Sequence, residues 1–240
     1  MNEYELKVYD EVEDWKRKLT RRSGMMKRLS KKAQVKVNEY IPDKVHQMMT
    51  DSIKAMVKAT LLGSQLTTNH NQALGLTLEE KDELVRKKIS TYQKTAIVEG
   101  AGTGAGGILL GLADFPLLLS IEMKFLFETA AIYGFNTKEY EERLFILHVF
   151  QLAFSSDEIR RETLEDIENW ESRKEQLVEM DWRKFQQEYR DYIDLAKMLQ
   201  LVPGIGAFVG AYANNNILKT LGETAMNAFR IRLLQKAPEL

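Results

Sequence analysis

The chain contains no cysteine, only four prolines and only three histidines among its 240 residues. Without cysteine it can form no disulfide, no thiolate zinc site and no cysteine nucleophile. The three histidines, His46, His70 and His148, lack the spacing of a helical zinc site, so we expect no bound metal. His148 lies in the apolar run LFILHVF, and we expect it to be a hydrogen-bonded core residue.

The chain also lacks a long apolar run without charge. Its most apolar segment, residues 108–123, is interrupted by Asp114 and Glu122. A standard spanning helix needs about 20 consecutive, mostly apolar residues, so none is predicted. The acidic N-terminus, MNEYELKVYDEVEDW, has no apolar core of the kind that a signal peptide carries. These features favour a cytoplasmic protein that can attach peripherally to the inner face of the cell membrane.

The net charge is only −1, but the charges are unevenly distributed. Six acidic residues lie between positions 3 and 14, and positions 16–36 then carry ten basic residues and no acidic one. A basic helix with apolar residues among its cations suits an anionic membrane surface. The alternative is pairing with the acidic segment 157–194 of the same chain. The expected membrane contacts are Lys16, Arg17, Lys18, Arg21, Arg22, Lys27, Arg28, Lys31 and Lys32.

Nucleic acid is not an expected partner, because aromatic residues are missing from the basic stretch and the rest of the chain is not basic.

Helical periodicity runs through almost the whole chain outside its glycine-rich segments. Helices are predicted over residues 3–20, 25–40, 43–62, 78–97, 116–133, 137–154, 157–200 and 206–234, and no strand is predicted. Thr77 and Glu80 have the spacing of a capping box, and Gly134 is placed to end the apolar helix before it. We therefore predict an all-α, multi-helix bundle with one domain over residues 1–240, in which residues 1–40 form a separable charged arm.

Six of the fourteen glycines lie within residues 100–111. The segment contains G-x-G-x-x-G, which binds dinucleotides only where a strand precedes it within a βαβ unit. The residues before it predict a helix, so we expect no nucleotide and no other cofactor.

A second interpretation places the glycines on helices. They recur every three or four residues, as on one helical face, in two sets: Gly100, Gly104, Gly107 and Gly111, and then Gly206 and Gly210. Small residues at this spacing let two helix backbones meet closely. We predict two glycine-rich helical hairpins that pack together in the core or turn toward lipid.

Two acids in the apolar segment are the candidate catalytic residues. Asp114 precedes Pro116 and is placed to cap the helix that begins there. Alternatively, Asp114 and Glu122 are buried acids with raised pKa values that act as acid or base. Eight residues of helix separate them by about 12 Å, so a shared pair would require a break in the helix.

Two blocks of the sequence resemble the EcsC family. The first, GAGTGAGGILLGLADFPLLLSIEMKFLFETAAIYGF, has the glycine run, an Asp before a proline, a long apolar helix and a closing Tyr-Gly. The second, VPGIGAFVGAYANNNILKTLGETAMNAFRIRLL, has two Gly-Ala pairs and a late Ala-x-x-x-Phe-Arg. The resemblance implies a bacterial protein, cytoplasmic or membrane-peripheral, that is encoded beside an ABC transporter linked to secretion. It supplies no catalytic residues.

The expected function is that of a non-enzymatic, membrane-peripheral accessory protein that assists or regulates an ABC exporter. Two alternatives are a hydrolase that acts on lipid or peptide through its buried acids, and a carrier that holds a small apolar ligand between its helices.

Overall fold

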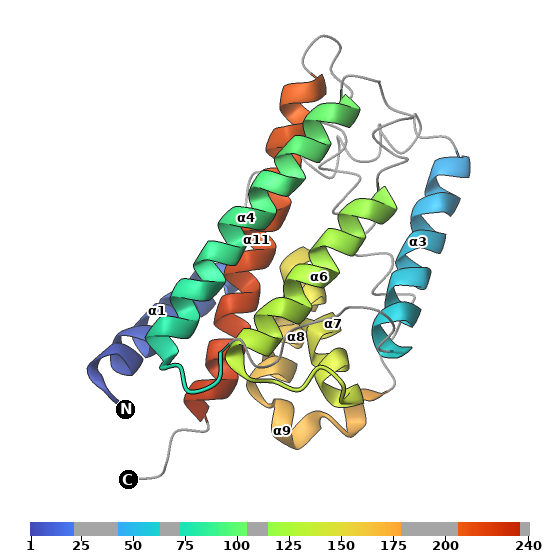
Figure 1. Ribbon diagram of the computed structural model, residues 1–240. Helices are drawn as coiled ribbons and strands as arrows, with labels where there is room; N and C mark the ends of the chain where they lie inside the picture. Colours follow the sequence, from blue (N-terminus) through green and yellow to red (C-terminus); the bar gives the residue numbers. More distant parts are fainter. Residues whose placement is uncertain (22–42, 63–72, 105–114, 179–205, 236–240) are drawn as a thin grey trace.

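A computed structural model describes residues 1–21, 43–62, 73–104, 115–178 and 206–235, and within these ranges all regular structure is helical (Figure 1). This confirms the predicted all-α class. The helices are α1 (Glu3–Thr20), α3 (Asp43–Leu62), α4 (Leu78–Gly104), α6 (Phe115–Tyr133), α7 (Tyr140–Phe154), α8 (Asp157–Glu168), α9 (Trp170–Arg173), the 3-10 turn η1 (Gln176–Val178) and α11 (Gly206–Gln235).

The helix ends follow the local sequence. Before α4, the Thr77 amide donates to Glu80 Oε2 at 2.8 Å and the Glu80 amide donates to Thr77 Oγ1 at 3.3 Å, which confirms the capping box. Gly134 ends α6 with φ of 94°, a conformation that costs glycine little. The Phe135 amide then donates to the Ala130 carbonyl at 3.0 Å, which satisfies a terminal carbonyl of α6.

Helices α4 and α11 form a long antiparallel pair through the middle of the bundle (Figure 1). Ala96 pairs with Asn214, whose side-chain amide donates to the Ala96 carbonyl at 3.2 Å. Further along, Gly222 lies against Ile89. We call this interface the α4–α11 seam.

The other helices pack around this pair. Helix α6 lies antiparallel to α4, α3 covers α6 on its other side, and α7 and α8 pack behind them (Figure 1). Helix α1 lies across α4 and α11 and buries Val8 and Val12. Aromatic rings fill the centre, where the Phe229 ring centroid is 5.2 Å from those of both Phe135 and Phe145.

Four helices begin or end together at one end of the bundle. Here α4 ends and α3, α6 and α11 all begin (Figure 1). We call it the junction end. In the sequence, three segments adjoin it: residues 22–42 before α3, which are rich in basic residues, the glycine-rich residues 105–114 between α4 and α6, and residues 179–205 before α11, which carry charges of both signs.

Three predicted boundaries differ from the structure, and the helix predicted over 25–40 lies outside the described residues. The helix predicted over 137–154 begins at Tyr140. The helix predicted over 78–97 continues to Gly104, so the first glycines of the run extend a helix. The helix predicted over 157–200 is wrong within residues 157–178, because α8 stops at Glu168 and Asn169 takes a non-helical conformation before the short α9. The prediction of two glycine-rich hairpins is not shown, since residues 105–114 and 179–205 lie outside the described ranges.

Candidate functional site

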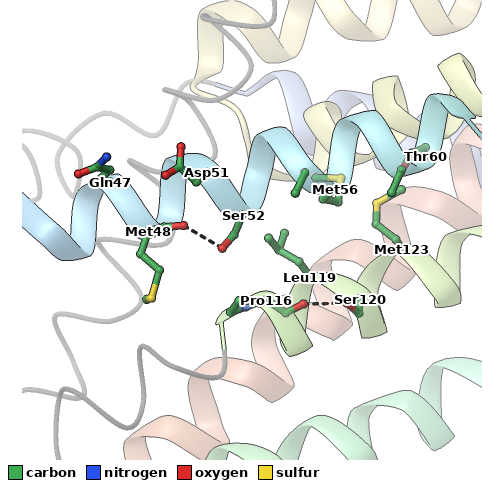
Figure 2. Close-up of a pocket in the computed structure, with 12 residues that line it drawn as sticks. Gln47, Met48, Asp51, Ser52, Met56, Thr60, Pro116, Leu119, Ser120 and Met123 are labelled. Carbon is green, nitrogen blue, oxygen red and sulfur yellow. Dashed lines mark hydrogen bonds between the residues drawn. The ribbon is translucent and has the colours of Figure 1, made fainter. Parts of the chain in front are cut away.

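An apolar cleft of about 890 Å³ lies between α3 and α6 (Figure 2). Its volume is within the range of about 300–1,000 Å³ that ligand pockets occupy. The two helices run in the same direction along it, so that residues near the start of each lie at one end. The lining residues are Gln47, Met48, Asp51, Ser52, Ala55, Met56, Ala59, Thr60, Pro116, Leu119, Ser120 and Met123.

The cleft changes character along its length. Near the junction end its lining is mixed: Met48 and Pro116 lie beside Ser52 and Ser120, and the exposed side chains of Gln47 and Asp51 lie at the outer edge of α3 (Figure 2). Further in, Met56 and Met123 are buried and the lining is apolar. We call the first part the mouth and the second the inner part. Flexible, polarizable methionine side chains suit a surface that adapts to different apolar shapes.

The hydroxyl groups at the mouth bond to their own helices. Ser52 donates to the Met48 carbonyl and Ser120 donates to the Pro116 carbonyl, each at 2.8 Å (Figure 2). Their oxygens retain acceptor lone pairs toward the cleft. The carboxylate of Asp51 is also an acceptor, so most polar groups at the mouth are suited to a ligand group that donates hydrogen bonds.

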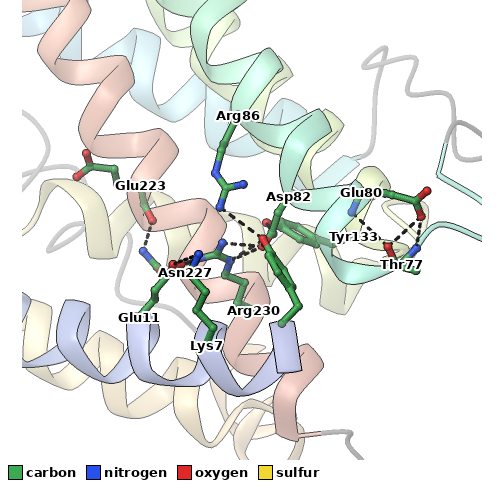
Figure 3. Close-up of polar contacts among 11 residues, drawn as sticks. Lys7, Glu11, Thr77, Glu80, Asp82, Arg86, Tyr133, Glu223, Asn227 and Arg230 are labelled. Carbon is green, nitrogen blue, oxygen red and sulfur yellow. Dashed lines mark hydrogen bonds and ion pairs between the residues drawn. The ribbon is translucent and has the colours of Figure 1, made fainter. Parts of the chain in front are cut away.

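A second constellation is a buried polar cluster at the far end of the α4–α11 seam (Figure 3). Asp82 of α4 is 0% exposed and accepts from Arg230 of α11, with Nη2 at 2.6 Å and Nε at 3.1 Å from Oδ2. Tyr133 of α6 donates to Asp82 Oδ1 at 2.5 Å, and Tyr4 of α1 donates to Oδ2 at 2.8 Å. Glu11 of α1 reaches Arg230 Nη1 at 3.1 Å. Four helices are thus joined through one carboxylate.

The charges in this cluster reinforce one another. Burial and the negative charge of Asp82 raise the pKa of Tyr133 well above its ordinary value, so the phenol stays protonated and donates. Burial alone would lower the pKa of Arg230, but its bonds to Asp82 raise it, so the guanidinium stays charged. Because every member has a partner, the cluster is suited to fixing the helices in place.

The sequence analysis did not identify Asp82, Tyr133 or Arg230. The spacing of an acid, a tyrosine and an arginine over about 150 residues carries no local signal. The one available hint was Arg230 within the apolar stretch AMNAFRIRLL, where an arginine requires a partner.

The predicted acids are only partly placed. Glu122 is fully buried within α6 and is not part of the cleft lining. Asp114 lies outside the described residues, so whether the two meet stays a prediction. His148 is buried as predicted, with Nδ1 2.9 Å from the Leu144 carbonyl and its ring 5.1 Å from that of Trp170. Burial lowers the pKa of His148 to about 4, so its side chain is neutral near pH 7.

One of the basic residues at the end of α1 pairs with an acidic residue of a different helix. Lys16 Nζ lies 2.8 Å from Glu168 Oε1 of α8 and also pairs with Glu13. Lys16 therefore pairs with the acidic segment 157–194, which was the alternative to membrane contact. Lys18 and Arg21 are exposed, as is Arg17, which pairs with Asp14. The other predicted contacts, Arg22, Lys27, Arg28, Lys31 and Lys32, lie outside the described residues.

The predicted packing glycines fall near one end of the seam. Continuing the pairing of Ala96 with Asn214 toward the junction end places Gly100 and Gly104 opposite the backbone around Gly210 and Gly206. Their close contact stays a prediction, and Gly107 and Gly111 lie outside the described residues.

The close approach that the structure does describe is at another glycine. A Cβ added at Gly222 would lie 2.7 Å from Ile89 Cγ1, which is well inside van der Waals contact. This glycine stands alone in NNNILKTLGETAM, outside the repeated spacing, and the sequence analysis therefore missed it.

No helix in the described ranges is long and apolar enough to cross a membrane. Among the same residues, no three His, Asp or Glu side chains come together in a group that could hold a metal ion.

The fold is an α-helical bundle built on two long antiparallel helices, and its sequence matches a known family along nearly its full length. Residues 6–234 match the model of the EcsC protein family, and the chain belongs to this family. It is 52% identical to Protein EcsC of Bacillus subtilis (strain 168) over 229 residues, which cover 95% of this chain and 96% of that protein. It is also 31% identical to the uncharacterized protein YdbA of the same organism over 163 residues, or 66% and 60% of the two chains. No solved structure matches the chain.

Proposed function

We propose that this protein is a non-enzymatic accessory protein that binds the inner face of the cell membrane through its junction end and acts beside an ABC exporter. The observation that carries the proposal is the exposure of apolar side chains at that end. Val98 of α4 is 73% exposed and Leu117 of α6 is 50% exposed, and Ile97 is exposed beside them. Large apolar side chains exposed on neighbouring helices near one end favour a partner or lipid surface.

Two of the chain segments that adjoin the junction end also support membrane binding at this end. The segment between α4 and α6 is apolar and glycine-rich, and the one before α3 is basic, with a composition suited to anionic headgroups. The opposite end also exposes Leu62 and Leu74, at 69% and 74%. However, the segment between these two residues, GSQLTTNHNQ, is polar and contains no lysine or arginine that would attract anionic lipid.

A lipid-flotation assay tests the membrane contact. We expect the protein to float with vesicles that contain anionic lipid, and to be released by high salt because basic residues contribute to binding. The double variant Val98→Asp/Leu117→Asp should lose most of the binding. The matched control Leu62→Asp/Leu74→Asp, at the opposite end, should retain it. A protein that stays soluble in the presence of anionic vesicles, or equal loss in both variants, would overturn the proposal.

The association with an ABC exporter rests on what the family resemblance implies. The test is fractionation of cells with and without the transporter that is encoded beside this protein. We expect the membrane-bound fraction to fall when the transporter is absent. An unchanged fraction would contradict the association while leaving lipid binding intact.

A hydrolase is the weaker alternative, because Glu122 is fully buried outside the cleft. If the buried acids were catalytic, Asp114→Asn or Glu122→Gln would abolish turnover of lipid or peptide without lowering the melting temperature. A carrier for a small apolar ligand is favoured by one specific observation, the cleft between α3 and α6.

A further inference from the structure

We propose that the α3–α6 cleft binds a single-chain amphiphile whose apolar tail lies in the inner part and whose uncharged or amine head lies at the mouth. The proposal goes beyond membrane attachment, because it assigns a ligand class and a binding site that are independent of contact with a bilayer.

The size of the cleft argues for a ligand. Helix interfaces in protein interiors are packed to the density of organic crystals, and voids larger than a water molecule are few. The α4–α11 seam meets this standard, with no room for a methyl group at Gly222. Between α3 and α6, by contrast, a groove of about 890 Å³ is open to solvent along exposed residues such as Ala55 and Ala59, although both helices contribute buried residues such as Ile53 and Phe125 to the same core.

The shape and lining of the cleft select a linear molecule. The inner part is formed by Met56 and Met123, both buried and apolar, with Thr60 beside them, and Leu119 lies between this part and the mouth (Figure 2). A hydrocarbon tail placed there would gain roughly 0.8 kcal/mol for each buried CH₂ group. Two alanines, Ala55 and Ala59, line the cleft along α3 and keep it wide.

The mouth selects the head of the ligand. Asp51 is the one charged residue among the described residues that line the cleft. A ligand carboxylate or phosphate would be repelled by it, whereas an ammonium would be attracted. The Ser52 and Ser120 hydroxyls already donate to backbone carbonyls, so they accept from the ligand, and among the side chains at the mouth Gln47 is the donor. A head with N–H or O–H donors therefore matches this set of acceptors.

The mouth also lies toward the junction end, where α3 and α6 begin (Figures 1 and 2). An amphiphile that leaves a bilayer in contact with this end would meet the cleft at its open part, with the tail able to slide between the two helices. Head selection does not depend on this route, and it can be measured without vesicles.

The test compares three ligands with the same tail. Dodecylamine and dodecanoate, each below its micelle concentration, and dodecanol, below its solubility limit, compete at pH 7.5 with Nile red bound to the full chain. We expect the amine and the alcohol to displace the dye, and the amine to bind at least about tenfold more tightly than the carboxylate, which corresponds to about 1.4 kcal/mol. Equal binding of the amine and the carboxylate would overturn the head assignment.

Three variants locate the site. Asp51→Asn should reduce the preference for the amine over the carboxylate about tenfold and leave dodecanol binding unchanged. Ala55→Trp, and independently Ala59→Trp, should abolish dye and ligand binding by filling the cleft. The control Lys58→Trp places the same side chain at an exposed position of α3 outside the lining and should bind normally.

Circular dichroism confirms that each variant is folded. Ligand binding that survives in both cleft-filling variants, or is lost equally in Lys58→Trp, would overturn the proposal. These outcomes are distinct from failure of the membrane proposal, which is read from vesicle flotation of Val98→Asp/Leu117→Asp.

Discussion

The α4–α11 seam and the α3–α6 cleft are both interfaces between helices that share one core, but they are built in opposite ways. In the seam, polar side chains bond across helices: Asp82 of α4 meets Arg230 of α11, and Asn214 of α11 meets the Ala96 carbonyl of α4. In the cleft, Ser52 and Ser120 bond to carbonyls of their own helices. The polar groups of the seam therefore join two helices, whereas those of the cleft do not, and the surface of the cleft remains available to a ligand.

The difference indicates where stability and binding reside in this protein. Removing Asp82 leaves a buried charge without its partner, and adding a methyl group at Gly222 creates a steric clash. The seam should therefore tolerate little change. Several lining residues of the cleft are exposed, including Gln47, Ala55 and Ser120, so changes there should alter binding more than folding. Each prediction below tests one side of this contrast.

The largest effect is expected for Asp82→Ala. The substitution leaves the Arg230 guanidinium buried without its main partner and removes the acceptor for Tyr133 and Tyr4. Breaking a buried ion pair from one side costs about 3–5 kcal/mol. Urea denaturation should show a loss of this size. The control Glu11→Gln removes the half-exposed partner of Arg230 and should cost under about 1 kcal/mol. Equal losses would show that the cluster is not centred on Asp82.

A second prediction concerns His148, which packs on Trp170 beside the seam. Its pKa is about 4 in the folded protein, because of burial, against 6.5 ordinarily. Between these values the unfolded chain binds a proton that the folded protein does not, so stability must fall as the pH is lowered from 6.5 to 4. The full loss is about 3 kcal/mol.

The measurement is the free energy of unfolding between pH 7 and pH 4 for the native chain and for His148→Gln. Carboxylates titrate in part of this range in both proteins, so the difference between the two curves isolates the histidine. We expect the variant to lose stability less steeply. Parallel curves would mean that His148 takes up its proton without unfolding the bundle.

The third prediction probes the contact at Gly222. An alanine there must displace Ile89, whose branch atoms Cγ1 and Cγ2 would lie 2.7 and 3.1 Å from the new methyl group. Overpacking of this kind costs about 1–3 kcal/mol. Combining Gly222→Ala with Ile89→Ala should recover part of the loss, giving a favourable coupling energy in a double-mutant cycle. Additive losses would show that the two helices separate freely at this point.

The sequence predicted the helices better than their contacts. Periodicity located α1, α3 and α11 closely, and two caps, Thr77 with Glu80 and Gly134, were identified from local spacing. These features depend on neighbours within a few residues. The break at Asn169 was missed because the charged segment around it carries no proline or glycine to mark the end of a helix.

The contacts of the seam and the cleft depend on how distant segments pair. Asp82 and Arg230 are 148 positions apart, and nothing in either local sequence indicates the other. The cleft was anticipated only as a general space between helices, because a void is a property of two surfaces that fail to meet. The close helix contact predicted from the glycine spacing stays a prediction, and that spacing missed Gly222, where a single glycine lies against Ile89 of the facing helix.

The smallest effect on the free energy of unfolding is expected for a substitution in the cleft. Ala55→Trp adds an entire indole ring, yet it enters the open space between α3 and α6 and displaces no packed side chain. Its effect on the free energy of unfolding should be within about 0.5 kcal/mol, as for an ordinary surface substitution. Gly222→Ala adds one methyl group and should cost more. Parallel thermal melts of the two variants measure the contrast directly. If Ala55→Trp is the more damaging of the two, the space between α3 and α6 is filled in solution and the distinction between seam and cleft is wrong.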